Sequence, residues 1–157
     1  MGAPTPAAAA LSAEGAVFLQ HRCNIDHDGA PPGLQVAEQL GVDAARVFRT
    51  LVASAAGELV IAICPVTARL DTKALAAGFG AKSAELVDAA TAQRATGYVV
   101  GGISPFGQRR RLPTVLDLSA TNWDTIFVSG GRRGLEIELA PADIIRVTSA
   151  RVLALTR

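Results

Sequence analysis

The sequence predicts a mixed α+β domain in which most neighbouring strands run antiparallel. Three observations support this prediction. Apolar runs of strand length outnumber the segments with helical periodicity. Most of these runs are joined by short turns, and the helices occur as excursions between them. The regular alternation of strand and helix that indicates a doubly wound parallel sheet is missing from the sequence.

Each predicted helix carries a local start or stop signal. Thr5 can cap a first helix that has Pro6 in its first position and runs through the alanines to about Gly15. In the later helices the signal is a capping aspartate, a proline at the first position, or a glycine after the last turn. These later helices are expected at Gly33–Leu40, at Thr72–Gly78, within Asp88–Gly97 and at Pro141–Val147.

The predicted strands are short runs rich in β-branched and aliphatic residues. The turn Ser54–Gly57 predicts a hairpin, and a glycine–arginine turn, Gly130–Gly134, separates a later pair of strands. The segment His21–Pro32 contains chain breakers and is expected to be irregular. Strands are expected at Val17–Leu19, Val47–Ala53, Leu59–Cys64, Ala84–Val87, Tyr98–Val100, Thr114–Leu116, Thr125–Ser129, Leu135–Leu139 and Val152–Leu155.

Length and composition predict a single globular domain. Of the 157 residues, 50% are hydrophobic and 18% are charged. We expect residues 6–157 to form the domain, and residues 1–5 to be disordered or not to belong to the natural protein. A net charge of +1 excludes strong nucleic-acid binding driven by total charge alone. Aromatic residues make up 4%, too few for a base-stacking platform. No apolar run approaches the length of a membrane span, so no membrane partner is predicted.

The two cysteines, Cys23 and Cys64, do not form a disulfide framework, which favours a reducing, cytoplasmic setting. Cys64 lies in an apolar run and is more typical of a small core residue than of a reactive thiol. Cys23 could join His21 and His27 in a metal site, but no fourth ligand with matching spacing follows. An ordinary polar loop is therefore the favoured interpretation, and we predict no metal and no cofactor.

The chain is organised around the segment Thr96–Pro113, which reads TGYVVGGISPFGQRRRLP. Its glycines permit a close approach of the backbone, and its prolines stiffen the loop. Backbone N–H groups beside cations can bind an anionic group, and the turn Gly130–Gly134 has a similar composition. Runs of charge are otherwise solvated surface, so both interpretations stay open from composition alone.

Common catalytic motifs do not match this segment. Gly102 and Gly107 have the spacing of a phosphate-binding loop, but the Lys-Ser/Thr pair that should follow is absent and Pro105 interrupts the N–H cradle. No G-x-G-x-x-G opens a helix after a strand, and the G-x-S-x-G elbow of serine hydrolases is absent from the sequence.

Four stretches, together with the spacing between them, match one family. They are Val47–Leu51 (VFRTL), Ala62–Asp71 (AICPVTARLD), Ala92–Pro113 (AQRATGYVVGGISPFGQRRRLP) and Ser129–Leu139 (SGGRRGLEIEL). Through them the chain resembles the YbaK family of trans-editing proteins, relatives of the editing domain inserted in bacterial prolyl-tRNA synthetase. The combination of GGISPFG with SGGRRGL is specific, and the resemblance extends over essentially the whole chain from about Pro6.

The resemblance implies a barrel-like, mostly antiparallel β-sheet flanked by helices. It implies a cytoplasmic enzyme that hydrolyses mischarged aminoacyl-tRNA, above all Cys-tRNA(Pro), with the tRNA acceptor end and prolyl-tRNA synthetase as partners. In this family no enzyme side chain is the nucleophile: the thiol of the bound cysteine attacks its own ester carbonyl, and a cyclic thioester leaves the tRNA. The protein would then position the ester, exclude bulky side chains and donate hydrogen bonds to the developing oxyanion.

The resemblance also implies roles for individual residues. The implied catalytic residues are Arg49, Gly101, whose backbone N–H would face the substrate carbonyl, and Ser129. The implied substrate-binding residues are Thr50, Gly102, Ile103, Ser104 and Glu136. The residues that would meet tRNA phosphates are Arg109, Arg110, Arg111, Arg132 and Arg133.

The chain departs from the family pattern at three places. Arg49 replaces the usual lysine, Glu136 replaces the usual aspartate, and a tyrosine that commonly precedes His27 is shifted or lost, with Ile25 nearby. A guanidinium is a planar fork that stays protonated, whereas an ammonium is compact and can lose its proton. Two alternatives therefore stay open: a deacylase for another small amino acid, such as alanine, and a non-catalytic module that binds tRNA or the synthetase.

Overall fold

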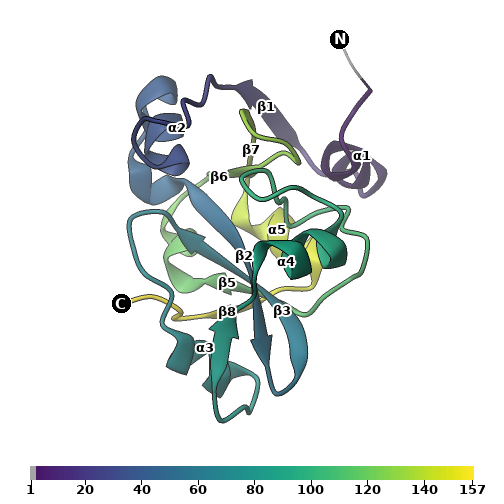
Figure 1. Cartoon of the computed structure of the whole chain (residues 1–157). Helices are drawn as coiled ribbons and strands as arrows, with labels where there is room; N and C mark the ends of the chain where they lie inside the picture. Colours follow the sequence, from purple (N-terminus) through teal and green to yellow (C-terminus); the bar gives the residue numbers. More distant parts are fainter. Residues whose placement is uncertain (1–2) are drawn as a thin grey trace.

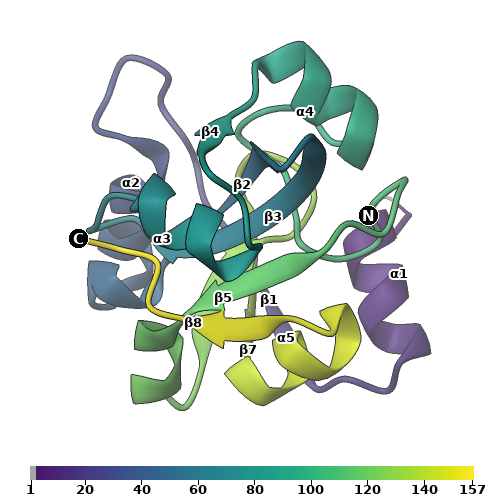
Figure 2. The same ribbon diagram turned by 90° about the horizontal axis from the view of Figure 1, so that it is seen from below.

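The computed structural model describes residues 3–157 and has a mixed α+β architecture with two sheets (Figures 1 and 2). The helices are α1 (Pro6–Ala13), α2 (Pro32–Leu40), α3 (Thr72–Gly78), α4 (Ala89–Thr96) and α5 (Pro141–Thr148), with the short 3-10 helices η1 (Ala44–Arg46) and η2 (Leu118–Asn122). The strands are β1 (Phe18–Arg22), β2 (Phe48–Ala55), β3 (Glu58–Pro65), β4 (Ala84–Leu86), β5 (Thr114–Asp117), β6 (Ile126–Ser129), β7 (Leu135–Leu139) and β8 (Arg151–Leu153).

Most strand pairs are antiparallel. One sheet has the order β1-β7-β6 and the other the order β4-β2-β3-β5-β8, in which β3–β5 and β5–β8 run parallel. An isolated bridge between Val47 and Phe127 connects the two sheets, which do not close into a complete barrel. Helices α4 and α5 overlap in Figure 1 but lie at opposite sides of the molecule in Figure 2. The predicted mixed, mostly antiparallel sheet flanked by helices is confirmed.

The hairpin β2–β3 forms at the predicted turn. Ala56 and Gly57 both have left-handed φ values, 53° and 76°, which is the geometry of a two-residue turn that matches the twist of its strands. The resulting register places Arg49 opposite Cys64 and Thr50 opposite Ile63. Because side chains alternate along a strand, Arg49 and Thr50 point to opposite faces of the sheet.

The helix caps form where the sequence predicts them. The Thr5 hydroxyl accepts from the N–H of Ala8, and the carboxylates of Asp71 and Asp88 accept from N–H groups in the first turns of α3 and α4. Each cap of this kind stabilises its helix by about 1 kcal/mol. Thr5 is thus part of the fold, although it belongs to the segment expected to be disordered; residues 1–2 of that segment lie outside the described residues.

The prediction of a strand at Tyr98–Val100 is wrong. These residues form turns between α4 and the glycine loop, and Val99 and Val100 are exposed rather than paired in a sheet. Tyr98 is buried, and its hydroxyl donates to the carbonyl oxygen of Phe106 at 2.6 Å. The first strand also continues through Arg22, into the segment expected to be irregular.

Three apolar clusters hold the layers together. The largest lies between the two sheets, a second joins the five-stranded sheet to α3, and a third lies beneath α2 against β6. Thr50 is on the face of β2 that borders the first cluster, and Arg49 is on the face that borders the second. Among residues 3–157, no helix has the length and apolar character needed to cross a membrane.

Candidate functional site

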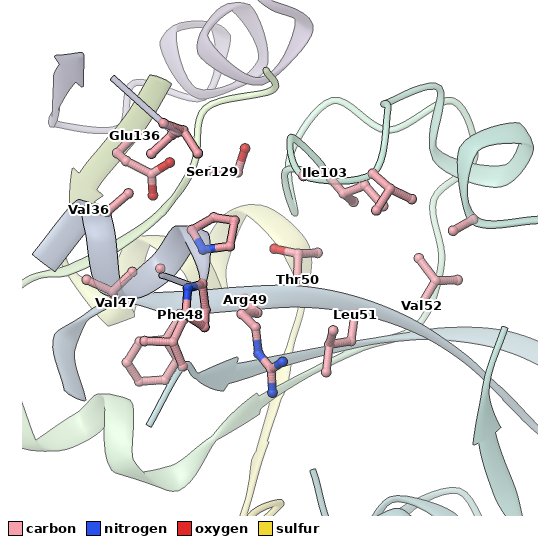
Figure 3. A pocket seen from close by; sticks show the side chains of 18 of the residues that line it. Val36, Val47, Phe48, Arg49, Thr50, Leu51, Val52, Ile103, Ser129 and Glu136 are labelled. Atoms are coloured by element: carbon pink, nitrogen blue, oxygen red, sulfur yellow. The ribbon is translucent and has the colours of Figure 1, made fainter. Parts of the chain in front are cut away.

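A cavity of about 470 Å³ lies where α2, β2, α4 and the glycine loops meet. Its wall is mostly apolar, and its polar side chains come from β2, β6 and β7. Figure 3 shows Ser129 and Glu136 on one side of this cavity and Ile103 on the other. The lining residues are Ile25, Pro31, Pro32, Gly33, Leu34, Val36, Val47, Phe48, Arg49, Thr50, Leu51, Val52, Val66, Leu86, Val87, Ala89, Ala92, Val100, Gly101, Ile103, Ser129, Gly134 and Glu136.

The Thr50 hydroxyl lies in this wall without a partner. Among residues 3–157, its Oγ1 is the one side-chain nitrogen or oxygen that is fully enclosed and makes no hydrogen bond. A buried hydroxyl without a partner costs about 1–3 kcal/mol of folding free energy, so such groups are rare in folded proteins. Because Thr50 also borders the cavity, it is a candidate for binding a ligand.

Arg49 lies at the rim of the cavity rather than inside it. Figure 3 shows its guanidinium on the opposite side of β2 from Thr50. Its Nη2 lies 3.4 Å from the carbonyl oxygen of Ala68, and the side chain is exposed. This long contact holds the guanidinium weakly, and an exposed arginine changes rotamer within nanoseconds. Arg49 therefore borders the same cavity as Ser129 and Glu136, but its guanidinium points away from them.

Glu136 supplies a carboxyl group to the cavity. It is 8% exposed, and its carboxylate makes no hydrogen bond to another group of residues 3–157. Burial disfavours the charged form and raises the pKa of this carboxyl to about 7. Near neutral pH the group is therefore poised between its two protonation states, and a cation that entered the cavity would favour the ionised form.

Ser129 faces Glu136 across the pair β6–β7. Its hydroxyl accepts a hydrogen bond from the N–H of Gly131 at 3.2 Å, which holds the side chain at the entrance to the glycine–arginine turn. Neither Ser129 nor Thr50 has a hydrogen bond to a histidine or carboxylate within residues 3–157. A serine or threonine nucleophile is activated through such a hydrogen bond, which neither of these side chains makes.

The two glycine motifs contact each other beside the cavity. Gly101 has a φ of 93°, lines the cavity, and has an N–H that donates no hydrogen bond within residues 3–157. Gly102 is buried, and a Cβ on this residue would lie 2.7 Å from Cα of Arg132, in the other motif. The absence of a side chain at residue 102 is therefore what allows the GGISPFG and SGGRRGL loops to pack backbone against backbone.

Two of the predicted substrate-binding residues lie behind the cavity wall. Ile103 lines the cavity, but Gly102 and Ser104 do not. Ser104 is fully buried; its hydroxyl accepts from the N–H of Phe106 and its carbonyl oxygen accepts from the side chain of Gln108. These contacts shape the loop, so the structure places Gly102 and Ser104 in support of the site rather than at its surface.

The three consecutive arginines contact the ends of two helices. The backbone N–H groups of Arg109 and Arg110 donate to the last carbonyl oxygens of α4, at 2.9 and 3.3 Å. The guanidinium of Arg111 donates to the carbonyl oxygen of Val147 and to the hydroxyl of Ser149, at the C-terminal end of α5. The run therefore has a capping role, while the side chains of Arg109 and Arg110 are exposed and form no salt bridge within the described chain.

The histidines and cysteines are separated by the fold. His21 pairs with Glu138, whereas His27 contacts Arg133, whose guanidinium lies beside Gly101. No group of three or more histidine, cysteine, aspartate or glutamate side chains within residues 3–157 is arranged to hold a metal ion. Cys64 is fully buried, and burial raises its thiol pKa to about 12, which makes it an inert core residue.

Comparison with known proteins identifies the family. The model of the aminoacyl-tRNA editing domain matches residues 33–147. The chain belongs to the aminoacyl-tRNA editing domain family. EbsC of Enterococcus faecalis, which carries the provisional name Cys-tRNA(Pro)/Cys-tRNA(Cys) deacylase, is 39% identical over 123 residues, covering 77% of this chain and 74% of EbsC. The uncharacterised protein YwhH of Bacillus subtilis is 31% identical over 119 residues, covering 75% of each chain.

Solved structures show the same fold at low sequence identity. A protein provisionally identified as a trans-editing enzyme for prolyl-tRNA synthetase superposes with a TM-score of 0.85 at 18% identity, covering 97% of this chain and 95% of that one. The hypothetical protein APE2540 superposes with a TM-score of 0.86 at 22% identity, covering 97% and 99%. The predicted family is confirmed, and so is the enzyme class of this editing-domain protein, an aminoacyl-tRNA deacylase.

The apolar wall of this editing domain was not identified from the sequence. Phe48 and Val52 lie on the same face of β2 as Thr50 and continue the wall on either side of it. The alternation of β2 could have indicated these residues, since every second side chain faces the same way. The contributions of Leu34 and Val87 had no comparable signal, because they come from separate segments that meet only in the folded chain.

Proposed function

We propose that this editing-domain protein acts in trans to hydrolyse mischarged Cys-tRNA(Pro), with the substrate thiol as the nucleophile. The proposal is carried by the polar content of the cavity: a buried carboxyl group and two hydroxyl groups in an apolar wall, with neither hydroxyl hydrogen-bonded to a base. A site without its own activated nucleophile fits a reaction in which the substrate provides one. The name of the relative EbsC supports the same choice of substrate.

In the proposed reaction the Cys-tRNA ester enters the cavity with its amino acid first. The ionised carboxylate of Glu136 accepts hydrogen bonds from the α-ammonium group, and the hydroxyl of Thr50 donates to an ester oxygen. The substrate sulfur attacks the ester carbonyl carbon, and the Gly101 N–H donates to the oxyanion that develops. The carbon–oxygen bond to the ribose then breaks, the thiol proton ends on the ribose oxygen, and a cyclic thioester leaves, which water then opens to free cysteine. Ser129 lines the cavity beside this centre.

A deacylation assay with a panel of charged tRNAs tests this function. Wild type should clear Cys-tRNA(Pro) much faster than Ser-tRNA(Pro), because a hydroxyl is a poorer nucleophile than a thiol. Equal rates for the two would argue against attack by the substrate thiol. Preference for Ala-tRNA(Pro) would assign the domain to another small amino acid, and no turnover of any charged tRNA would remove the enzymatic proposal.

The same assay tests the catalytic role proposed for Arg49. That role requires the guanidinium to turn from the carbonyl oxygen of Ala68 towards the cavity, which the weak 3.4 Å contact allows. Arg49→Ala should then lower kcat/KM, and Arg49→Lys should restore part of it, since lysine keeps the charge but loses the planar fork. An unchanged kcat/KM in Arg49→Ala would leave Arg49 as a surface residue outside the reaction.

Thr50→Val should lower the deacylation activity without lowering the thermal stability. Valine has nearly the shape of threonine but removes the hydroxyl that has no partner in the free protein, so thermal stability should stay equal or rise. Deacylation should fall by roughly tenfold, the value of one hydrogen bond made in the transition state. Thermal unfolding and kcat/KM measured on the same preparation check both expectations; a loss of stability without a loss of activity would contradict them.

The arginine run should contribute to tRNA binding through Arg109 and Arg110. Replacing both with glutamine should weaken binding and lower the dependence of log Kd on log salt by about one for each phosphate that the variant no longer binds. Arg111→Gln should mainly reduce thermal stability, because its guanidinium caps α5. An unchanged salt dependence in the double variant would leave Arg109 and Arg110 as solvated surface.

Prolyl-tRNA synthetase is the protein partner we propose, with residues 6–157 acting as one domain.

A further inference from the structure

Arg133 packs against Gly101, which lines the cavity, and also contacts His27. On one side, its Nη2 lies 2.5 Å from the position that a Cβ on Gly101 would take, so the guanidinium packs against the Gly101 backbone. On the other side, its Nη1 is within hydrogen-bonding distance of the His27 imidazole, at 2.8 Å from Nε2. Gly101 lines the cavity, and His27 precedes the segment Pro31–Gly33, which also lines it.

The charge of Arg133 is not neutralised by the protein. The salt bridges formed among residues 3–157 involve other arginines, Arg46 and Arg146, and His21. The partner of Arg133 is an imidazole, which is neutral or positive, and the side chain is exposed. A guanidinium has five N–H donors in a planar fork, so most of them stay available to a ligand.

The charged groups Glu136 and Arg133 differ in exposure. Glu136 carries a buried carboxyl group in the cavity wall, whereas Arg133, three residues earlier in the same turn and strand, places an exposed cation beside Gly101. An aminoacylated terminal nucleotide has the complementary order: an α-ammonium group on the amino acid, then the ester and ribose, then a phosphate on the 5′ side of the nucleoside. A ligand that places its ammonium at the buried Glu136 therefore directs its phosphate outwards, towards the exposed Arg133.

We propose that Arg133 binds the 5′ phosphate of the aminoacylated terminal nucleotide, held in place by Gly101 and His27. This inference rests on the proposed function for the identity of the ligand. Arg133 lies against the backbone of Gly101, whose N–H faces the reacting ester in that function, so one phosphate contact also fixes the distance between the ester and its hydrogen-bond donor. A bidentate arginine–phosphate contact is among the stronger charge-assisted hydrogen bonds.

Binding of non-hydrolysable analogues tests the inference without relying on activity. The probes are 3′-amino-3′-deoxyadenosine carrying cysteine in amide linkage, with and without a 5′ phosphate, titrated calorimetrically into the full chain. In wild type the phosphate should lower Kd at least about tenfold, as expected for hydrogen bonds to a charged group. In Arg133→Gln the two probes should bind equally. Arg151→Gln, which removes an exposed arginine that stacks on Phe79 at the far edge of the five-stranded sheet, should keep the wild-type preference.

The outcomes separate this inference from the proposed function. Equal Kd values for the two probes in wild type, or a phosphate preference that survives in Arg133→Gln with its melting temperature unchanged, overturn the phosphate role. A phosphate preference that depends on Arg133 in a protein that deacylates no charged tRNA would keep the binding site and remove the enzymatic proposal. Rising salt should reduce the preference in wild type and leave the binding of the unphosphorylated probe nearly constant; equal salt effects on both probes would also count against the phosphate contact.

Discussion

Gly102→Ala should reduce deacylation of Cys-tRNA(Pro) by on the order of a hundredfold, the effect of displacing reacting groups by about 1 Å. The added Cβ would lie 2.7 to 2.8 Å from the backbone atoms Cα and C of Arg132 and N of Arg133. Backbone cannot rotate away as a side chain can, so the two glycine loops must separate. That separation moves the Gly101 N–H relative to Ser129, although Gly102 itself does not line the cavity.

The stability cost of Gly102→Ala should be about 1–3 kcal/mol, as for other overpacked sites. Gly15→Ala is a matched control, because Gly15 has a φ of 69° and open space around it, so alanine there costs about 1–2 kcal/mol from backbone strain alone. Denaturant unfolding and kcat/KM should show comparable losses of stability in both variants but a loss of activity in Gly102→Ala alone. Equal activity in the two variants would show that the contact between the loops does not position the site.

Glu136→Gln should have opposite effects on stability and activity. The folded carboxyl keeps its proton up to a pKa of about 7, whereas the ordinary value is 4.5, so the native state binds more protons between these two pH values. The free energy of unfolding of wild type therefore falls as pH rises from about 4.5 to about 7, by on the order of 3 kcal/mol, and is constant above. Glutamine does not ionise, so the variant should lack this fall and be the more stable protein at pH 8.

Activity should move the other way, because only the ionised carboxylate attracts the substrate ammonium group. Wild-type kcat/KM should rise as pH increases through about 7, and Glu136→Gln should lose this step and roughly a hundredfold of activity, the upper range for a hydrogen bond to a charged group. Glu138→Gln is the control: hydrogen bonds from Thr125 and His21 lower the pKa of Glu138, so removing this carboxylate should reduce stability at neutral pH while the step near pH 7 persists. A step that survives in Glu136→Gln would assign the titration to another group.

Helix ends were predictable from the sequence because their signals are local. Thr5, Asp71 and Asp88 each bind N–H groups within three residues, and the left-handed Gly97 ends α4 as glycine commonly does. Such contacts depend on neighbours in the chain, so they could be inferred without knowing the rest of the fold. The parallel pairing of β5 with β3 and β8 depends on segments that are distant in sequence, and no local pattern indicated it.

The error at Tyr98–Val100 shows where local propensity fails. The run has the tyrosine and valines typical of a strand, but Gly97 and Gly101 on either side have φ values of 81° and 93°, which a strand cannot accommodate. The buried Tyr98 hydroxyl then anchors the segment to Phe106. Two glycines at the ends of a three-residue apolar run were the available sign that it forms a turn.

The candidate site was partly predictable. Family resemblance singled out Thr50, Ser129, Glu136 and Gly101, and the structure brings all four to one cavity. The same resemblance grouped Arg49 with them, and because adjacent residues in a strand face opposite ways, the sequence VFRTL already implied that the side chains of Arg49 and Thr50 leave the strand on opposite faces. The packing of Gly102 on Arg132 joins residues thirty positions apart in the numbering, and it could not be inferred from either motif alone.

The hydrogen bond from the Thr5 hydroxyl to the carbonyl oxygen of Gly130 connects residues 125 positions apart. During synthesis, the chain that emerges first holds α1, α2 and β2 but lacks the strands that carry Ser129 and Glu136. Closing so long a loop costs entropy before any contact compensates for it, so this wall of the cavity forms late in folding. A nascent chain that has not yet exposed β6 and β7 therefore has no complete cavity, and the domain gains its capacity to act on tRNA only after these strands have joined the fold.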